Sequence, residues 1–291
     1  MMENGNTTHR QVRDAIQALG LHGSAICLHS SLSSFGHLEG GAEALVQAFL
    51  SQGCTLVVPT FTYDCQVSTP VERQIRRNGT DYARVIEHSE AYDRDSPMIS
   101  PSMGAVPATI LSLPARVRGI HPLNSFAAIG PLAEAIIARQ SHLDVYGPLK
   151  VLYDHPPAHI ALIGVDLTKA TPIHFAEQTA GRRLFRQWAL ELDGTTTEVA
   201  VGSCSHGFNS LAPAVEQIER SITVGRSTWR TYPFRGFIDH VAAAIASDPA
   251  ITHCGNPDCL ECRDAVLGGP LLGSHSQELV GERQHLLLPP S

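Results

Sequence analysis

Long apolar segments are missing from this sequence. No run of about 18 apolar residues occurs in it, which excludes an ordinary transmembrane helix. The first residues are polar and hold no apolar signal-peptide core, so we expect a cytoplasmic protein with reduced cysteines. Basic patches are missing too, and the formal net charge is -7. We therefore expect neither nucleic acid nor a membrane as a partner.

Internal repeats are also missing, so a repeat architecture is not expected. The 291 residues have an ordinary globular composition, with 43% hydrophobic and 17% charged residues. A chain of this length can bury a large core. We predict a single domain over residues 8–267, an excursion or lid around 64–100, and a loosely ordered tail over 268–291. The protein is expected to be a monomer or a homodimer.

Buried strands alternate with amphipathic helices along the chain. Two apolar strands, 24–31 and 54–64, run into polar residues and are joined by a helix over 40–53. A third strand, 158–167, leads into a helix that begins at Thr171 and Pro172. This order predicts an α/β fold with its chemistry at the strand ends. Further helices are expected over 8–20, 104–113, 131–140 and 234–248, a strand within 118–130, and a hairpin over 184–204.

Two polar turns are candidate ligand sites. Residues 28–41 pass from a strand into a serine-rich turn and a glycine pair, where free backbone N–H groups can hold an anionic or amide-bearing ligand. A helix-capping turn has the same pattern. No lysine follows the glycines, as a phosphate-binding loop would require. In residues 116–130, Arg116 and Arg118 precede a His-Pro turn, where they can grip a phosphate or simply be solvated.

His174 and Glu177 lie three residues apart on the helix predicted after Thr171. That spacing places both side chains on one helix face. There a carboxylate can orient a histidine and stabilise its protonated form, as a catalytic base requires. A surface ion pair has the same spacing. The apolar strand directly before this helix favours catalysis, because catalytic groups gather at such strand ends.

Three cysteines are clustered near the end of the chain. Cys259 and Cys262 have the spacing of zinc ligands, and Cys254 or the neighbouring His253 can supply a third. Cys204 is a distant candidate for the fourth. A closed site of this kind would be structural, because it leaves no position for a reactive water; free thiols and a redox role are the alternatives. The remaining cysteines are two predicted core residues, Cys27 and Cys54, and one candidate nucleophile, Cys65.

Four segments, taken in order along the chain, carry a resemblance to a known family. They are LHSSLSSFGHLEGGAEALVQAF, GCTLVVPTFTYD, MGAVPATILSLPARVRGIHPLNSFAAIGPLAEAI and ALIGVDLTKATPIHFAEQTAG. Together they resemble the aminoglycoside 3-N-acetyltransferases, the antibiotic N-acetyltransferase family, over about residues 10–265. Some members also carry a late Cys-x-x-Cys and a cysteine before a Gly-Phe-like turn, similar to Cys259, Cys262 and Cys204.

The resemblance implies a fold and a reaction. The fold would be α/β with a central mixed sheet flanked by helices, unrelated to the GNAT acetyltransferases. The reaction would be transfer of acetyl from acetyl-CoA to a primary amine of an aminoglycoside, the 3-amino group, which confers resistance. His174 and Glu177 match the family's catalytic histidine and glutamate. Coenzyme A would lie along two loops that contain Ser30, Ser31, Leu32, Ser33, Phe35, Arg118, His121, Pro122 and Ser125.

A mechanism follows from this match and from general chemistry. A protonated amine cannot attack a thioester, so His174, held by Glu177, would take its proton. An N–H group of the Ser30–Ser33 turn would stabilise the oxyanion. A polycationic substrate would be held by a tyrosine and by acidic side chains: Tyr63, Asp64, Glu90, Asp93 and Asp95.

The chain departs from the family pattern in two places. Gly119 stands where members often have serine, so a hydroxyl contact to coenzyme A is missing. The segment YGPLKVLYDH replaces a longer Gly-Ser-Pro element, which changes the expected substrate wall. Three rival functions therefore remain: acetylation of another small amine such as a natural-product intermediate, a zinc-dependent hydrolase built on His174 and Glu177, and non-catalytic binding of coenzyme A or an antibiotic.

Overall fold

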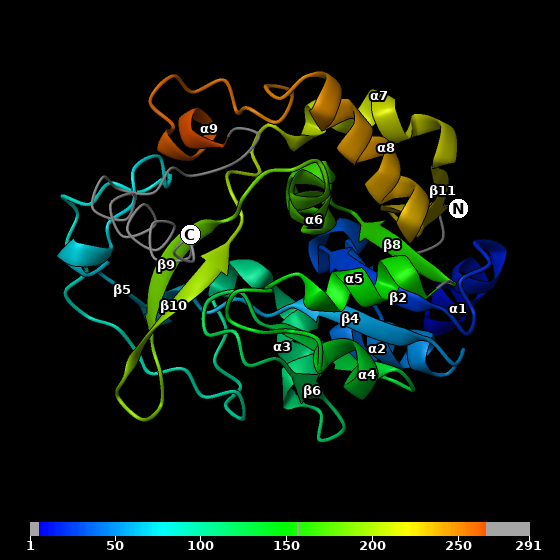
Figure 1. The fold of residues 1–291 in the computed structure, drawn as a ribbon. Helices are drawn as coiled ribbons and strands as arrows, with labels where there is room; N and C mark the ends of the chain where they lie inside the picture. The colour runs from blue at the N-terminus through cyan, green and yellow to red at the C-terminus, as the bar shows by residue number, and fades with distance from the viewer. Residues whose placement is uncertain (1–5, 156, 266–291) are drawn as a thin grey trace, which may run out of the picture.

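A mixed sheet forms the centre of the computed structural model, which describes residues 6–155 and 157–265 (Figure 1). Its strands are β2 (Ala25–Ser30), β4 (Thr55–Pro59), β6 (Val117–Arg118), β7 (Phe126–Ile129), β8 (Ala158–Ile163), β11 (Arg220–Val224) and β12 (Ser227–Pro233). They lie in the order β11-β12-β8-β2-β4-β7-β6. The three central strands β8, β2 and β4 are parallel, and their neighbours β12 and β7 are antiparallel. The predicted α/β fold is therefore confirmed.

Helices cover both faces of this sheet, because its central strands are apolar on both sides. Ile26 and Leu28 of β2 face one cluster of buried residues, whereas Ala25 and Cys27 face the other. Alternating side chains of a strand point to opposite faces, which explains the division. The first face is covered by α1 (His9–Ala18), α2 (Gly41–Leu50) and α3 (Ala105–Ser112). The second is covered by α4 (Ala133–Ile137), α5 (Gly147–Asp154), α6 (Pro172–Thr179), α7 (Ala212–Val215) and α8 (Phe234–Ser247).

The first helix shows how local sequence sets an element. Thr8 caps α1, and its partner Gln11 completes a capping box that satisfies two otherwise unpaired backbone N–H groups. Val12, Ala15 and Ile16 follow at helical spacing and are buried against the sheet. The predicted helix over 8–20 is thus confirmed, to within a residue or two at each end.

A smaller sheet lies beside the large one. It has the order β10-β9-β5 and contains β9 (Phe185–Leu190), β10 (Thr196–Val201) and β5 (Gln66–Val67). The first two form the predicted hairpin, and β5 brings in the segment 64–100. That segment is otherwise irregular and also contacts the short helix α9 (Leu260–Asp264), where Gly79 N–H donates to the Asp264 carboxylate over 2.9 Å. A two-stranded pairing of β1 (Asn6–Thr7) with β3 (His37–Leu38) completes the strands.

Several structural features were not predicted. Among them are α5, formed by residues 147–154, and the β11–β12 hairpin, which adds two strands to one edge of the large sheet. The proposed domain limits stay a prediction, and the tail over 268–291 lies outside the described residues. None of the helices in the described ranges has the length and apolar character needed to cross a membrane.

Candidate active site

His174 and Glu177 form a buried pair at the start of α6. The chain leaves β8, passes through a short 3-10 helix at Leu167–Lys169, and enters α6 with Pro172 in its first turn. His174 Nδ1 lies 2.8 Å from Glu177 Oε2. The side chains are only 12% and 3% exposed, so this is not the ordinary surface pair that the spacing alone allowed.

Glu177 is also held by two residues outside its helix. Arg182 binds its Oε1, and the Ser203 hydroxyl lies 3.1 Å from Oε2. Burial raises the pKa of the Glu177 carboxyl, but its bonds to His174, its attraction to Arg182 and its bond to Ser203 outweigh burial and leave the pKa lowered. Glu177 is therefore a carboxylate at neutral pH and accepts the His174 Nδ1–H. This assigns the free lone pair of the imidazole to Nε2.

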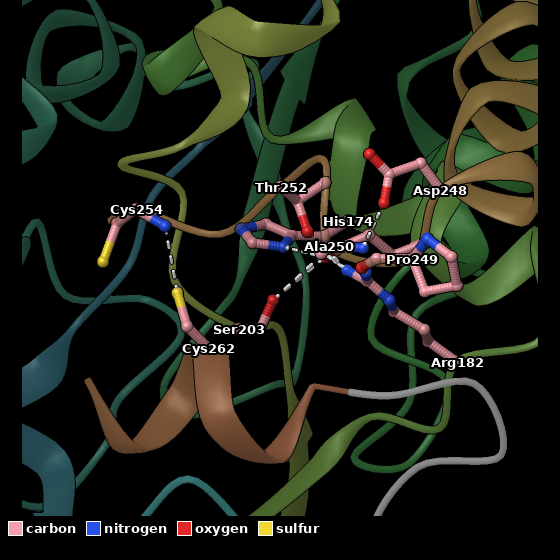
Figure 2. A network of polar contacts seen from close by, with 10 residues as sticks. His174, Arg182, Ser203, Asp248, Pro249, Ala250, Thr252, Cys254 and Cys262 are labelled. Atoms are coloured by element: carbon pink, nitrogen blue, oxygen red, sulfur yellow. Dashed lines mark hydrogen bonds and ion pairs between the residues drawn. The ribbon is translucent and has the colours of Figure 1, made fainter. Parts of the chain in front are cut away.

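Arg182 is itself fixed by the chain that follows α8. The guanidinium donates to Thr252 Oγ1 over 2.7 Å and to the Pro249 carbonyl, as Figure 2 shows. These bonds and the ion pair with Glu177 offset part of the cost of burying the guanidinium, whose Nε has no hydrogen-bond partner among the described residues. Sequence reasoning missed Arg182, because its link to Glu177 depends on a turn after α6 that no motif marks.

The His174 ring is packed between aromatic side chains. Tyr146 stacks on it with ring centroids 6.2 Å apart, and Phe208 meets it edge-on at 4.9 Å. Gly202 closes the third side: a Cβ there would lie 2.5 Å from the Tyr146 hydroxyl and 2.7 Å from the imidazole. Only a glycine leaves space for the ring, a requirement that the sequence did not reveal.

Two cavities adjoin at α6. The first has a volume of about 1030 Å³ and is lined by residues 30–34 of the serine-rich turn. The second has a volume of about 860 Å³ and is lined by His174, Tyr63 and Asp64. Both have Thr168, Lys169 and Thr171 in their walls, so the two cavities meet directly before His174 in the chain.

The cavities differ in charge. Lys169, Arg226 and Arg230 line the first, against one carboxylate, Asp166. The second has three carboxylates in its wall, Asp64, Asp81 and Glu261, against Arg84 and the shared Lys169. Burial leaves the pKa of the Glu261 carboxyl raised overall, although His174 lowers it, so these two groups are close enough to interact. The first cavity thus suits an anionic ligand, and the second suits a cationic one.

Several predicted ligand residues lie away from both cavities. Phe35 is fully buried and packs edge-on against Trp229, so it does not face the first cavity as expected. Arg118 is 3% exposed and donates to Ser125 Oγ and to the carbonyls of Thr60, Ser96 and Met98. These hydrogen bonds use its donors within the fold. Arg118 therefore reaches neither cavity, and it is not a solvated loop arginine.

The His-Pro turn is likewise a structural element. His121 Nε2 lies 2.8 Å from the Ala200 carbonyl, and its Nδ1 accepts the Asn124 N–H at 2.8 Å. Burial lowers the pKa of His121 to about 4, which keeps it neutral. The carbonyl of Pro122 accepts a bond from Thr62, and Ser125 is fully buried. The expected contacts of this turn with coenzyme A are therefore not supported by its geometry.

Only some of the predicted substrate residues line a cavity. Of the five predicted substrate residues, Tyr63 and Asp64 line the second cavity, whereas Glu90, Asp93 and Asp95 do not. Two carboxylates that were not among the predicted substrate residues, Asp81 and Glu261, line this cavity as well. The first cavity likewise gains Lys169, Arg226 and Arg230. Of these only Lys169 had a signal in the sequence, its position beside the His174 helix.

Four cysteines converge behind the second cavity. The Sγ atoms of Cys204, Cys254, Cys259 and Cys262 all lie within 4.8 Å of one another, and Cys254 N–H donates to Cys262 Sγ over 3.3 Å (Figure 2). Tetrahedral zinc with bonds of about 2.3 Å would place its sulfurs about 3.8 Å apart, so four thiolates at this spacing fit zinc. His253, the alternative ligand, is not part of this group.

The other cysteines are core residues. Cys27 and Cys54 are fully buried, as predicted. Cys65 is fully buried too, and burial raises its pKa to about 11, which makes it a poor nucleophile.

The two departures from the family pattern have structural explanations. A side chain at Gly119 would collide with Gln140, whose amide donates to the carbonyls of Asn124 and Val145. The residue therefore serves packing, away from both cavities. The shortened element around Tyr146 begins α5 and supplies the ring that stacks on His174.

Comparison with known proteins agrees with this architecture. The family model described as aminoglycoside 3-N-acetyltransferase matches residues 27–246. The chain belongs to the aminoglycoside 3-N-acetyltransferase family. It is 30% identical over 178 residues to the aminoglycoside N(3')-acetyltransferase-like protein YokD of Bacillus subtilis, a match that covers 58% of this chain and 64% of that protein. It is 29% identical over 187 residues to aminoglycoside N(3)-acetyltransferase IX of Micromonospora chalcea, covering 62% and 64%.

These matches span about 64% of each relative's length. Solved structures in the family extend the likeness of fold further. The apoenzyme of aminoglycoside acetyltransferase AAC(3)-IVa is 23% identical with a TM-score of 0.73, covering 91% of this chain and 98% of that chain. Solved structures of this fold with ligands are also similar. AAC-IIIb with CoASH is 19% identical with a TM-score of 0.68, covering 83% of this chain and 97% of that chain. A mutant of AAC(3)-IVa with gentamicin is 23% identical with a TM-score of 0.72, covering 91% of this chain and 98% of that chain.

Proposed function

We propose that this protein transfers an acetyl group from acetyl-CoA to the 3-amino group of an aminoglycoside, and so confers resistance. One observation carries the proposal. A carboxylate-held histidine lines a cavity suited to a cation, close to the residues at which that cavity meets one suited to an anion. Such a junction brings acetyl-CoA and a protonated amine together on one base. A cytoplasmic location and a monomeric or homodimeric state belong to the same proposal.

Coenzyme A would occupy the first cavity. Its phosphate groups match Lys169, Arg226 and Arg230, and its amide-bearing arm would lie along the turn of residues 30–33. The complex of AAC-IIIb with CoASH supports a coenzyme A site in this fold. The aminoglycoside would occupy the second cavity, where Asp64, Asp81 and Glu261 can pair with its ammonium groups. The complex of the AAC(3)-IVa mutant with gentamicin supports that occupant.

The chemical steps follow from the protonation state of His174. Nε2 takes a proton from the substrate ammonium, directly or through one water, and the neutral amine attacks the acetyl carbonyl. The carbon–sulfur bond then breaks, and the leaving thiolate takes the proton from the imidazolium, which Glu177 has stabilised. The new amide nitrogen releases its remaining extra proton to solvent. Ser31 and Ser34 already use their N–H groups on the carbonyls of Ile163 and Ser31. The N–H groups of Leu32 and Ser33 therefore remain for the oxyanion.

We also propose that the four cysteines hold one structural zinc ion. All four would ligate the metal as thiolates, which leaves no open position on it for chemistry. Bound there, zinc would cross-link the loop after β10 to the segment around α9. The zinc hydrolase alternative is not supported, because His174 and Glu177 are not part of the metal-ligating group found in the described ranges.

The test is an acetylation assay. The protein is incubated with acetyl-CoA and a panel that includes gentamicin and apramycin, and the release of free thiol is followed together with the mass of each product. We expect thiol release at a rate of about 1–100 per second and a product heavier by one acetyl group. Release at background rates with every aminoglycoside would refute the antibiotic assignment. Acetylation of another small amine under the same conditions would place the chemistry on that substrate.

A further inference from the structure

The wall of the second cavity includes a helix too short to be stable alone. Helix α9 has five residues, and its segment contributes Cys259, Leu260 and Glu261 to the cavity. Isolated helices of this length are not stable in water, because a single turn does not repay the entropy of nucleation. The position of Glu261 therefore depends on what anchors the segment around it.

Two sets of contacts anchor α9. Cys259 is the N-cap residue of α9 and Cys262 lies in its first turn. Both belong to the four-cysteine cluster, which also includes Cys204 of the loop after β10. On the other side, the buried Asp264 accepts the Gly79 N–H over 2.9 Å and pairs with Arg263. Glu261 lies between these two sets of contacts and lines the cavity. The cysteine cluster and Asp264 thus bracket this residue on both sides.

We propose that Glu261 binds an ammonium group of the substrate and that the four-cysteine cluster positions it to do so. The inference rests on the proposed function, and it assigns this residue a part in selecting polycationic amines. Glu261 lines the same cavity as His174, whereas Asp64 and Asp81 belong to a different segment of the wall. A polyamine seated between these two walls would present one ammonium to Glu261 while another group approaches the His174 imidazole. Glu261 is a specificity residue here, and the cluster is a positioning device.

The first experiment compares Glu261→Gln with wild type. Gentamicin is titrated calorimetrically into the complex of each protein with coenzyme A, and KM and kcat are measured with acetyl-CoA. We expect the dissociation constant and KM to rise about tenfold, as for a lost charged hydrogen bond, with little change in kcat or in coenzyme A affinity. The increase should shrink in high salt. The matched control is Asp258→Asn, which removes the same charge from an exposed site in the same segment that does not line the cavity.

The second experiment tests the positioning role. Cys254→Ser removes one member of the cluster, and bound zinc is measured together with gentamicin binding. We expect a similar loss of affinity in Cys254→Ser, and no further loss when Glu261→Gln is added, because both changes remove one contact. Losses that add in the double variant would refute the positioning role.

The outcomes separate this inference from the proposed function. Wild-type turnover with an unchanged KM in Glu261→Gln would overturn the inference and leave the acetyltransferase assignment intact. A wild-type protein that neither binds nor acetylates gentamicin would overturn both.

Discussion

His174 Nδ1 lies 2.8 Å from one oxygen of Glu177, and Arg182 binds the other oxygen of the same carboxylate. The glutamate is thus shared between a catalytic candidate and a fixed positive charge. Arg182 neutralises Glu177 in a buried site, and Glu177 in turn orients the imidazole. The relationship fixes the orientation of the His174 ring, as the proposed role of this residue as a base requires.

Replacement of the base tests this relationship first. We expect His174→Ala to lower kcat by about 10²–10⁴-fold, the usual contribution of general-base catalysis, while coenzyme A binds as in wild type. Steady-state kinetics and calorimetry measure the two effects. His22→Ala, at an exposed site, is the control and should behave as wild type. Turnover at the wild-type rate in His174→Ala would remove this residue from the mechanism.

Removal of Arg182 should affect both stability and catalysis. Arg182→Met leaves the Glu177 carboxylate buried without its cation, which typically costs about 3–5 kcal/mol. We expect that loss in urea unfolding, together with a fall in kcat. Arg183→Met, at the exposed neighbouring position, should change neither. If Glu177→Gln fails to recover stability in the Arg182→Met background, the two groups are not a coupled pair.

Gly202 tests the packing of the imidazole. A Cβ at this position would lie 2.7 Å from the His174 ring, so we expect Gly202→Ala to displace the ring. We expect kcat to fall at least tenfold, which corresponds to a loss of about 1.4 kcal/mol of transition-state stabilisation. Gly236→Ala in α8 is the control, since its nearest contact would be an ordinary 3.7 Å. That helical substitution should be neutral or stabilising by about 0.5–1 kcal/mol. Equal kcat in the two variants would show that the ring tolerates the added methyl group.

Buried histidines predict how stability depends on pH. Burial lowers the pKa of His121 to about 4 and that of His29 to about 3, from an ordinary value of 6.5. As the pH falls below 6.5, the unfolded chain binds protons that the folded protein does not, so stability decreases. The slope should reach about 1.4 kcal/mol per pH unit for each histidine. Urea unfolding between about pH 7.5 and pH 5 measures it, and His121→Asn should flatten it. An unchanged slope in that variant would contradict the assignment.

The cysteine cluster predicts one bound zinc ion per chain. Elemental analysis of purified protein should find it, and Cys204→Ser should lower its affinity for zinc. Cys54→Ser, in the core and outside the cluster, should keep the metal even if it destabilises the fold. Full zinc retention in Cys204→Ser would argue against a four-thiolate site.

Much of the fold follows from local pattern. The apolar strand at 158–163 and the Pro172 signal after it placed His174 at a strand end, and its Glu177 partner followed from helical spacing. Contacts between segments that are distant in the sequence could not be predicted from local pattern. Arg118 was predicted to bind coenzyme A, yet it turns inward to carbonyls at Thr60 and Met98 that only the folded sheet brings near.

The cavity charges show the same limit. Asp64 follows a strand and could be predicted, whereas Glu261 lies on α9, whose contacts come from distant segments that contain Gly79 and Cys204. Glu90, Asp93 and Asp95 carry the charge expected of substrate residues but lie on another part of the same irregular segment. Without periodicity, the sequence of 64–100 does not indicate which carboxylates face inward.

The most direct test of His174 as the base is a structure of the protein with coenzyme A and gentamicin. We expect coenzyme A in the cavity lined by Arg226 and Arg230, and the substrate 3-amino nitrogen within about 3 Å of His174 Nε2, directly or through one water. A complex in which that amine approaches another base, with His174 Nε2 facing no substrate atom, would contradict it.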